Sequence, residues 1–310
     1  MQIAILIATK DRPEKLDSLL LSLTHSEQYI RQVVIVSSGN SISSIVKRYS
    51  DLINLKHIHS EISGQIHQKS IGIQAIEGGI NWILFLDDDV TLPPNSLEIL
   101  VSEYLNNSKF VNVFAFGLKI EGIKYRKYSW FIKLLLSWFF LYSKQKGRVL
   151  GSGHAQNYQD SLTDTETQWI NGISIWRIET LQSYGLINSK LSYAAYEDVI
   201  FSYRVSRNYP IIFASKVTVK SQDSDEIQPI TLNQFKSGSY MRYFFVSKYP
   251  NLSRIKLLIA QLLRSVQFTL FGDKTLSGII RFTHSVHIWF DLLRAFLFKI
   301  DPTFLLNKRF

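Results

Sequence analysis

Residues 82–89 have the sequence Trp-Ile-Leu-Phe-Leu-Asp-Asp-Asp, in which an apolar run is followed at once by three acids. Two other short apolar runs, at residues 3–8 and 33–36, also end abruptly in polar residues. Strands that are buried on both faces of a parallel sheet have this pattern. Residues 13–23, and more weakly 42–52, carry apolar residues at helical spacing. The alternation predicts an α/β fold with a doubly wound, mostly parallel sheet.

The remainder of the chain changes character near Gln234. Before this residue we expect helices at 96–105 and 197–206, strands at 111–118 and 211–214, and an extended segment at 169–175. After it the strand signals stop and long helical patterns follow. The sequence therefore predicts two domains, an α/β domain over residues 1–235 and a helical extension over residues 236–310.

Composition and charge limit the classes of protein. The chain has 310 residues, 46% of them hydrophobic, which is enough for a buried core. It has no cysteine, which excludes disulfides, thiolate metal sites and a cysteine nucleophile, and suits a reducing compartment. Residues 236–310 hold 12 Lys and Arg against 3 Asp and Glu, whereas residues 1–235 hold 23 against 22. This local positive charge indicates a local anionic partner, such as a lipid surface or a nucleic acid.

Two apolar segments suggest which anionic partner it is. Residues 128–142 have aromatic ends and basic flanks, which suits a helix lying in a membrane interface. Residues 279–298 have a wide apolar face that the membrane, the α/β domain or a second copy in a homodimer must cover. The positive extension favours a peripheral membrane surface. Its aromatic residues are mixed with aliphatic runs, which argues against nucleic acid. No uncharged run reaches the roughly 18 residues of a spanning helix.

The acidic triplet is the strongest chemical signal. Asp87 and Asp89 project to the same side of an extended backbone. Adjacent carboxylates repel one another, so a site that keeps them ionised usually supplies a cation. The pair can share a divalent metal such as Mn²⁺ or Mg²⁺, which can bridge the phosphates of a nucleotide. The alternative is a solvated acidic turn before the helix that follows Pro94; the position directly after a buried strand favours the metal site.

Glu197 and Asp198 are the second acidic signal, about 110 residues after the triplet. A carboxylate in a partly desolvated pocket can act as a general base that takes the proton of an acceptor hydroxyl. The alternative is an ordinary acidic pair at the start of a helix, where the helix dipole favours negative charge.

Seven motifs follow one another along residues 1–235. They are Ile7-Ala-Thr-Lys-Asp-Arg12, Val34-Ile-Val-Ser-Ser-Gly39, Gln68-Lys-Ser-Ile-Gly72, Phe85-Leu-Asp-Asp-Asp89, Gly172 with Arg177, Gly185-Leu-Ile187 and Glu197-Asp198. In this order they resemble the family 2 glycosyltransferases of GT-A fold, particularly bacterial enzymes that build lipopolysaccharide and capsule. The resemblance implies an inverting, metal-dependent glycosyltransferase that moves a sugar from a nucleoside-diphosphate sugar to a glycan or lipid-linked acceptor. It also implies a cytoplasmic enzyme, peripheral on the cytoplasmic face of the inner membrane.

The same resemblance implies roles for the matching residues. Asp87 and Asp89 bind the metal, and Asp198 is the general base, with Glu197 as the alternative. The donor is bound by Thr9, Asp11, Arg12, Ser37, Lys69 and Asp88, of which Asp88 contacts ribose or a metal-bound water and Lys69 approaches the phosphates.

The sequence departs from the family pattern at two places. Ser37 and Ser38 stand where an Asp commonly binds the base, and Lys220 stands where many members have a metal-binding His. A charged lysine is a poor metal ligand but can neutralise a diphosphate. Two other classes stay open, a nucleotidyltransferase and a non-catalytic, membrane-associated scaffold. A nucleotidyltransferase should have an early Gly-rich phosphate loop with a nearby lysine, and this sequence shows none.

Overall fold

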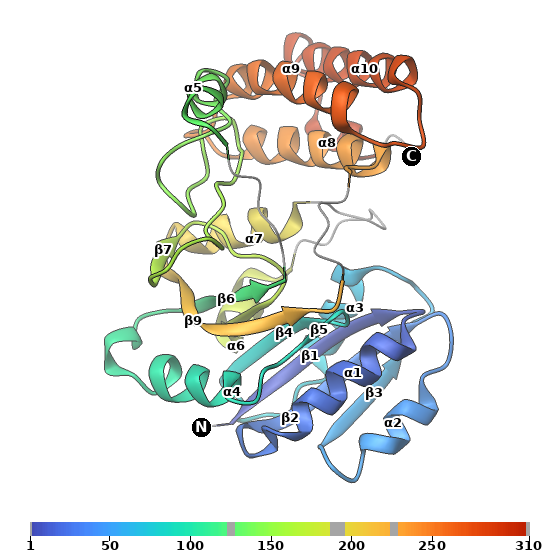
Figure 1. Cartoon of the computed structure of the whole chain (residues 1–310), viewed down its shortest axis with the longest axis vertical. Coiled ribbons are helices and arrows are strands. Elements are labelled where there is room, and N and C mark those ends of the chain that lie inside the picture. Colours follow the sequence, from blue (N-terminus) through green and yellow to red (C-terminus); the bar gives the residue numbers. More distant parts are fainter. Residues whose placement is uncertain (1, 123–127, 187–195, 224–228, 308–310) are drawn as a thin grey trace. The chain divides into compact units, whose positions relative to one another are not determined.

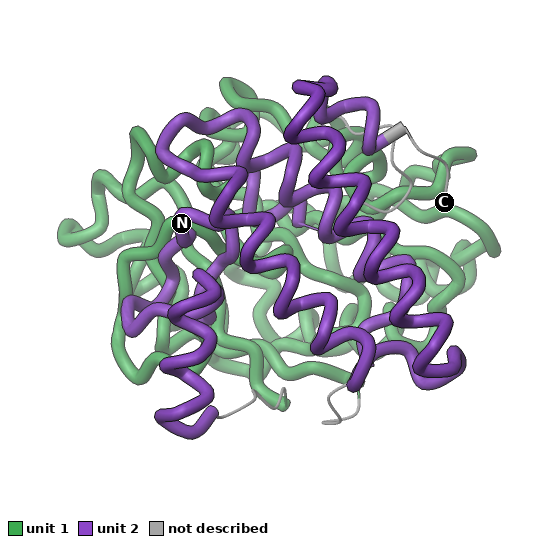
Figure 2. Tube along the Cα trace, turned by 90° about the horizontal axis from the view of Figure 1, so that it is seen from above, with its two compact units in different colours: residues 1–124, 158–192, 201–225 green, residues 125–157, 193–200, 226–310 purple. Residues whose placement is uncertain are grey.

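The chain divides into two compact units. The computed structural model describes residues 2–122, 128–186, 196–223 and 229–307 (Figure 1). Unit 1 comprises residues 1–124, 158–192 and 201–225, and unit 2 comprises residues 125–157, 193–200 and 226–310 (Figure 2). The predicted extension, 236–310, lies wholly in unit 2, which also takes in two earlier segments. Ile187 of the 185–187 motif and the basic residues Lys124, Arg126 and Lys127 before residue 128 lie outside the described residues.

Unit 1 is built on a single sheet with the strand order β3-β2-β1-β4-β8-β6-β9-β5, and β7 pairs with β9. The strands are β1 (Ile3–Lys10), β2 (Ile30–Ser38), β3 (Leu55–His59), β4 (Trp82–Asp87), β5 (Val90–Thr91), β6 (Ala115–Glu121), β7 (Thr165–Thr167), β8 (Ser174–Arg177) and β9 (Ile211–Ser221). β1 pairs in parallel with both β2 and β4, and β2 pairs in parallel with β3. The carboxyl ends of these four strands therefore meet at one edge of the sheet.

Helices cover both faces of this sheet. They are α1 (Pro13–Thr24), α2 (Ser43–Tyr49), α3 (Gln65–Gln74), α4 (Ser96–Ile99) with the π-helical segment Leu100–Leu105, α6 (Ile178–Tyr184) and residues 201–206 of α7 (Glu197–Ser206). Side chains alternate along each strand. Ile5 therefore packs in the core with Leu16 and Leu20 of α1, whereas Leu6 packs in the opposite core with Phe201 of α7. The doubly wound arrangement predicted from the sequence is confirmed.

Some boundaries differ from those predicted. β6 begins at Ala115 rather than at 111, because residues 108–110 form a 3-10 turn that buries Phe110. The extended segment predicted at 169–175 becomes a strand only from Ser174. β3 was not indicated, because as the edge strand it alternates polar and half-buried residues. The helix predicted at 197–206 has those bounds.

Unit 2 consists mainly of helices among its described residues, with a non-helical stretch at residues 141–157. Its helices are α5 (Trp130–Trp138), α8 (Leu232–Lys248), α9 (Arg254–Phe271), α10 (Gly278–Leu297) and α11 (Pro302–Asn307). A serine or threonine caps each of α5, α8, α9 and α10, its side chain accepting a bond from a backbone N–H of the first turn. α8, α9 and α10 pack against one another, and α11 packs against α8. Within the described ranges, no helix has both the length and the apolar character needed to cross a membrane.

Candidate functional site

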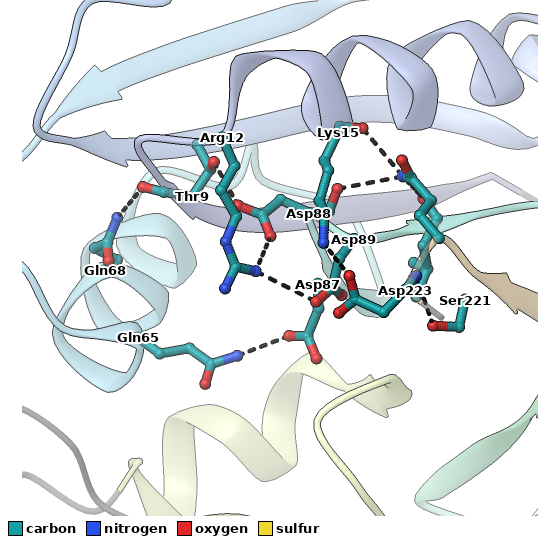
Figure 3. Close-up of polar contacts among 12 residues, drawn as sticks. Thr9, Arg12, Lys15, Gln65, Gln68, Asp87, Asp88, Asp89, Ser221 and Asp223 are labelled. Atoms are coloured by element: carbon teal, nitrogen blue, oxygen red, sulfur yellow. Dashed lines mark hydrogen bonds and ion pairs between the residues drawn. The ribbon is translucent and has the colours of Figure 1, made fainter. Parts of the chain in front are cut away.

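The acidic triplet lies at the carboxyl edge of the sheet in unit 1. Asp87 is the last residue of β4 and pairs with Ala8 of β1, one residue before Thr9. Thr9 pairs in turn with Ser37 of β2. The parallel register therefore brings predicted site residues from three distant parts of the sequence to one edge, as Figure 3 shows for Thr9 and the triplet. Ligands of open α/β sheets gather at such edges.

Asp88 is the buried centre of this edge. Its carboxylate accepts hydrogen bonds from Oγ1 of Thr9 at 2.7 Å and from Nη1 of Arg12 at 3.1 Å. The same Arg12 nitrogen lies 3.3 Å from a carboxylate oxygen of Asp89 (Figure 3). Arg12 therefore holds two of the three acids next to each other, against their mutual repulsion.

Asp87 turns toward helix α3. Its Oδ1 accepts a hydrogen bond from Nε2 of Gln65 at 2.7 Å and lies 3.6 Å from Nζ of Lys69. Lys69 is buried, and its ammonium lies 5.4 Å from the centre of the Phe85 ring. A β-carbon at Gly172 would lie 3.5 Å from both Lys69 Nζ and Asp87 Oδ2, so this glycine borders the ion pair directly.

Asp89 lies against the end of β9. The backbone N–H of Gln222 donates to the Asp89 carbonyl at 2.8 Å, and the Gln222 amide donates to the Val90 carbonyl at 2.9 Å. Asp223 forms an ion pair with Lys15 of α1. Burial and then the charges of Asp87, Asp88 and Asp223 raise the pKa of Asp89, although Arg12 opposes this. The acidic cluster, defined as Asp87, Asp88, Asp89 and Asp223, is therefore a place where a bound cation would relieve repulsion.

Asp11 closes the end of β1 toward β2. It has a backbone φ of +52°, and its Oδ1 accepts a hydrogen bond from the backbone N–H of Asn40 at 2.8 Å. A β-carbon at Gly39 would lie 2.3 Å from this oxygen, and Gly39 itself has a φ of +81°. Only glycine at position 39 therefore allows Asp11 to cap the turn after β2.

Ser37 belongs to a neighbouring polar group at the ends of β2 and β3. Its hydroxyl lies 2.8 Å from Nε2 of His57 and 3.4 Å from Nδ1 of His59. Burial, followed by the nearby His59, lowers the pKa of His57, so its imidazole is neutral at pH 7. The hydroxyl of Ser38 is buried and has no hydrogen-bond partner among the described residues. This edge thus offers uncharged donors and acceptors where an Asp was expected.

The second acidic signal belongs to unit 2. Glu197 and Asp198 are the first two residues of α7, and Oδ1 of Asp198 accepts a hydrogen bond from the backbone N–H of Val199 at 2.7 Å. Lys220 belongs to unit 1, where it pairs with Thr91, two residues after the triplet, and has an exposed side chain.

Four residues of this site were missed by sequence reasoning. They are Lys15, Gln65, Gln222 and Asp223. The last two follow directly after β9, so the rule that places ligands at strand ends would have found them had the strand predicted at 211–214 been extended to 221. No sequence pattern distinguished Lys15 or Gln65 from ordinary helix residues.

The site suits a hard cation only in part. Within the part of the chain that the structure describes, no three Asp, Glu, His or Cys residues are grouped to hold a metal ion. Asp87 and Asp89 offer carboxylate oxygens, the donor type that Mg²⁺ and Mn²⁺ prefer. These residues therefore fit a metal whose remaining ligands come from a bound diphosphate and water.

Comparison with known proteins agrees with the geometry. The family model described as glycosyl transferase family 2 matches residues 4–159, just over half of the chain. The chain belongs to glycosyl transferase family 2. Glycosyl transfer is the activity that this membership supports, which confirms the resemblance seen in the motifs. No curated protein sequence matches the chain.

Solved structures similar to this family 2 chain include S. aureus TarS 1-349 in complex with UDP-GlcNAc. That match has a TM-score of 0.59 and 14% identity, and covers 94% of this chain and 81% of that one. Another structure of TarS 1-349 matches with a TM-score of 0.58 and 15% identity, and with the same coverage. The structure of GalNAc-T7 with UDP, GalNAc and Mn²⁺ matches with a TM-score of 0.55 and 13% identity, and the match covers 83% of this chain and 53% of that one. At these identities the likeness concerns the fold, and it confirms the predicted GT-A type with C-terminal helices.

Proposed function

We propose that this family 2 protein is an inverting, metal-dependent glycosyltransferase that uses a nucleoside-diphosphate sugar. The observation that carries the proposal is the acidic triplet at the carboxyl edge of the parallel strands, tied to Thr9, Arg12 and Lys69. This arrangement puts carboxylates for a cation and cations for phosphates within one site of unit 1. A diphosphate with its metal requires both.

Each residue at this edge has a proposed role toward the donor. Asp87 and Asp89 would hold the divalent ion, which when bound supplies positive charge to the departing diphosphate. Lys69 and the exposed Lys220 supply further positive charge. Thr9, Asp11, Arg12, Ser37 and Asp88 bind the nucleotide, and Asp88, already bonded to Thr9 and Arg12, also fixes their positions.

The acceptor chemistry is assigned to Asp198, with Glu197 as the alternative base. In an inverting transfer the acceptor oxygen attacks the anomeric carbon from the face opposite the leaving diphosphate, and a carboxylate takes the hydroxyl proton. Both acids stand in the first turn of α7.

The apolar surface of unit 2 supports a peripheral membrane site. The side chains of Trp130 and Trp138 on α5 are 76% and 72% exposed. Two adjacent helices carry further exposed stripes at helical spacing, namely Ile255, Ile259, Leu262, Val266 and Leu270 on α9, and Ile279, Phe282, Phe290 and Leu297 on α10. Together with the positive charge of residues 236–310, these stripes suit anionic lipid of the cytoplasmic leaflet. Docking there would bring the enzyme to a lipid-linked acceptor.

Donor turnover tests the proposed chemistry. The full chain would be incubated with a panel of nucleoside-diphosphate sugars, beginning with UDP-GlcNAc, in Mn²⁺, Mg²⁺ or EDTA. We expect release of the nucleoside diphosphate from one donor, dependent on the metal, and inverted anomeric configuration in the product by NMR. Release of pyrophosphate would point to nucleotidyl transfer, and turnover unaffected by EDTA would remove the metal from the proposal.

Vesicle flotation tests the membrane site. We expect the chain to float with phosphatidylglycerol vesicles and much less with phosphatidylcholine vesicles. The double variant Trp130→Ser, Trp138→Ser should lose most of this binding, whereas Leu162→Ser, which removes an exposed apolar side chain of unit 1, should keep it. A wild-type chain that stays with neither vesicle and elutes as a dimer would favour the homodimer instead.

A further inference from the structure

A group of basic side chains lies inside unit 2. The cationic cluster consists of Arg242 on α8, Arg264 on α9 and His154 in the turn after Leu150. α8 and α9 pack against each other (Figure 1). The charges of both arginines act on His154, and the charge of Arg242 acts on Arg264. Arg242 also packs beside this turn, since a β-carbon at Gly153 would lie 3.2 Å from its Cγ.

The cluster has buried donors without acceptors. Arg242 is only 4% exposed, and its Nε and Nη1 atoms have no hydrogen-bond partner among the described residues. Nε of Arg264 also has no partner, and neither does Nε2 of His154, which donates or accepts according to the tautomer of the ring. In the described ranges neither arginine forms an ion pair with a carboxylate. Because buried polar groups are almost always satisfied, the arginine donors indicate an acceptor that belongs to a ligand.

The electrostatics of the cluster also indicate that an anion is missing. Burial, and then the charge of Arg242, lowers the pKa of Arg264 to about 9. Burial and both arginines lower the pKa of His154 well below its ordinary value, so its imidazole is neutral at pH 7. Arg264 remains charged at that pH, and unpaired buried charge is unfavourable. A bound anion would remove this cost.

Tyr196 joins the cluster to the start of α7. Its ring centre lies 4.6 Å from the Arg242 guanidinium carbon. Its hydroxyl donates to the Gly153 carbonyl at 2.5 Å and accepts from the backbone N–H of Ala155 at 2.8 Å. The residue has a backbone φ of +86°, which is rare for tyrosine and indicates that these contacts hold it in place. The cluster therefore contacts the residue two positions before Asp198.

We propose that Arg242, Arg264 and His154 bind a phosphate group carried by the acceptor. A guanidinium presents a planar fork of N–H donors that matches phosphate oxygens, and two of them suit a phosphodiester or a diphosphate. The location beside the proposed base assigns this group to the acceptor. That assignment rests on the proposed function, whereas the binding of phosphate does not.

Inorganic phosphate is the first probe. It would be titrated into the full chain by calorimetry in a phosphate-free buffer. We expect at least tenfold weaker binding in Arg264→Gln and Arg242→Gln, and a change of less than twofold in Arg294→Gln, which removes the same charge from an exposed position on α10. Absent binding in the wild type or unchanged binding in Arg264→Gln would overturn the proposal. Arg242 is buried, so Arg264→Gln decides the matter if Arg242→Gln fails to fold.

A second arm identifies the source of the phosphate. For a phosphate-bearing acceptor, Arg264→Gln should raise the acceptor KM about tenfold, leave the donor KM unchanged and leave flotation with phosphatidylglycerol vesicles intact. Loss of flotation in Arg264→Gln would identify a lipid headgroup and overturn the acceptor assignment. If phosphate binding depends on Arg264 but no donor is turned over, the anion site stands and the proposed function fails.

Discussion

The acidic cluster of unit 1 and the cationic cluster of unit 2 contrast in how their charges are matched. Each acid of the triplet contacts a cation, Arg12 for Asp88 and Asp89 and Lys69 for Asp87. In unit 2, Arg242 and Arg264 have an aromatic ring and a neutral histidine near them, and the described residues supply no carboxylate.

This difference separates two kinds of binding site. A matched cluster can hold its geometry without a ligand, because opposite charges fix one another. Under the proposed function its side chains would exchange partners when a donor and a metal bind. An unmatched cluster is stabilised by what binds to it. Removing the Asp88 charge from the acidic cluster should therefore lower the free energy of unfolding, whereas removing a charge from the cationic cluster should raise it.

The largest expected effect concerns the proposed general base. Asp198→Asn removes the proposed base but not a residue of the acidic cluster. We expect kcat to fall by about 10³-fold, in the range of general-base catalysis, with donor affinity unchanged. Single-turnover rates and donor titration by calorimetry measure the two quantities. Undiminished turnover would transfer the role to Glu197, for which Glu197→Gln is the matched variant.

Much of unit 1 was predictable because its strands are buried on both faces. The runs at 3–8, 33–36 and 82–86 have no polar residue, and burial on both sides permits none. The edge strand β3 escaped prediction because its side chains are exposed or only half-buried. The composition of unit 2 from three separate segments was also beyond the sequence, since pairing of distant helices leaves no local pattern.

The next effect concerns the stability of the matched cluster. Asp88→Ala removes a buried carboxylate, which leaves Thr9 without its acceptor and Arg12 with only the Asp89 carboxylate. We expect a loss of about 2–3 kcal/mol in the free energy of unfolding. Urea unfolding measures it, with Asp51→Ala as the control, because Asp51 is an exposed acid whose replacement should change stability by less than about 0.5 kcal/mol. Equal stability of the two variants would mean that Asp88 has no structural role.

The site was predictable where its polar residues follow directly after a strand. Thr9, Ser37 and the triplet all lie at ends of parallel strands, so one rule locates them. The partners of these residues were not predictable in the same way. Gln65 reaches Asp87 from α3, and Gln222 reaches the triplet from the residue after β9, by contacts that only the folded chain creates. Arg242 and Arg264 were likewise hidden within a generally basic segment, where burial alone distinguishes them.

A smaller effect tests the mismatch in unit 2. Arg242→Met replaces a buried, unpaired charge with an apolar side chain of similar length. We expect the free energy of unfolding in phosphate-free buffer to rise by about 1 kcal/mol, since relief of the buried charge outweighs the lost contact with Tyr196. Arg12→Met, in the matched cluster, should instead lower it by up to about 1 kcal/mol. Destabilisation by both variants would mean that the charge of Arg242 is balanced in the free chain.

The smallest expected effect is that of Asp89→Asn in the acidic cluster. This variant should raise the free energy of unfolding, whereas Asp88→Ala should lower it. Burial and neighbouring acids raise the pKa of Asp89 above its ordinary 3.8, so the folded chain holds this proton more tightly than the unfolded chain does. That contribution to stability is present below pH 3.8 and is lost as the pH rises through the folded-state pKa.

At pH 7 the ionised Asp89 therefore weakens the fold, and Asp89→Asn should raise the free energy of unfolding by less than about 1 kcal/mol. The gain should shrink as the pH falls toward 4, where the native carboxyl becomes protonated. Thermal melts of both proteins between pH 4 and 8 measure this. The same variant should bind donor and Mn²⁺ more weakly, because Asn has no negative charge for the cation to neutralise. A variant that is less stable and binds donor normally would show that Asp89 serves the fold and not the metal.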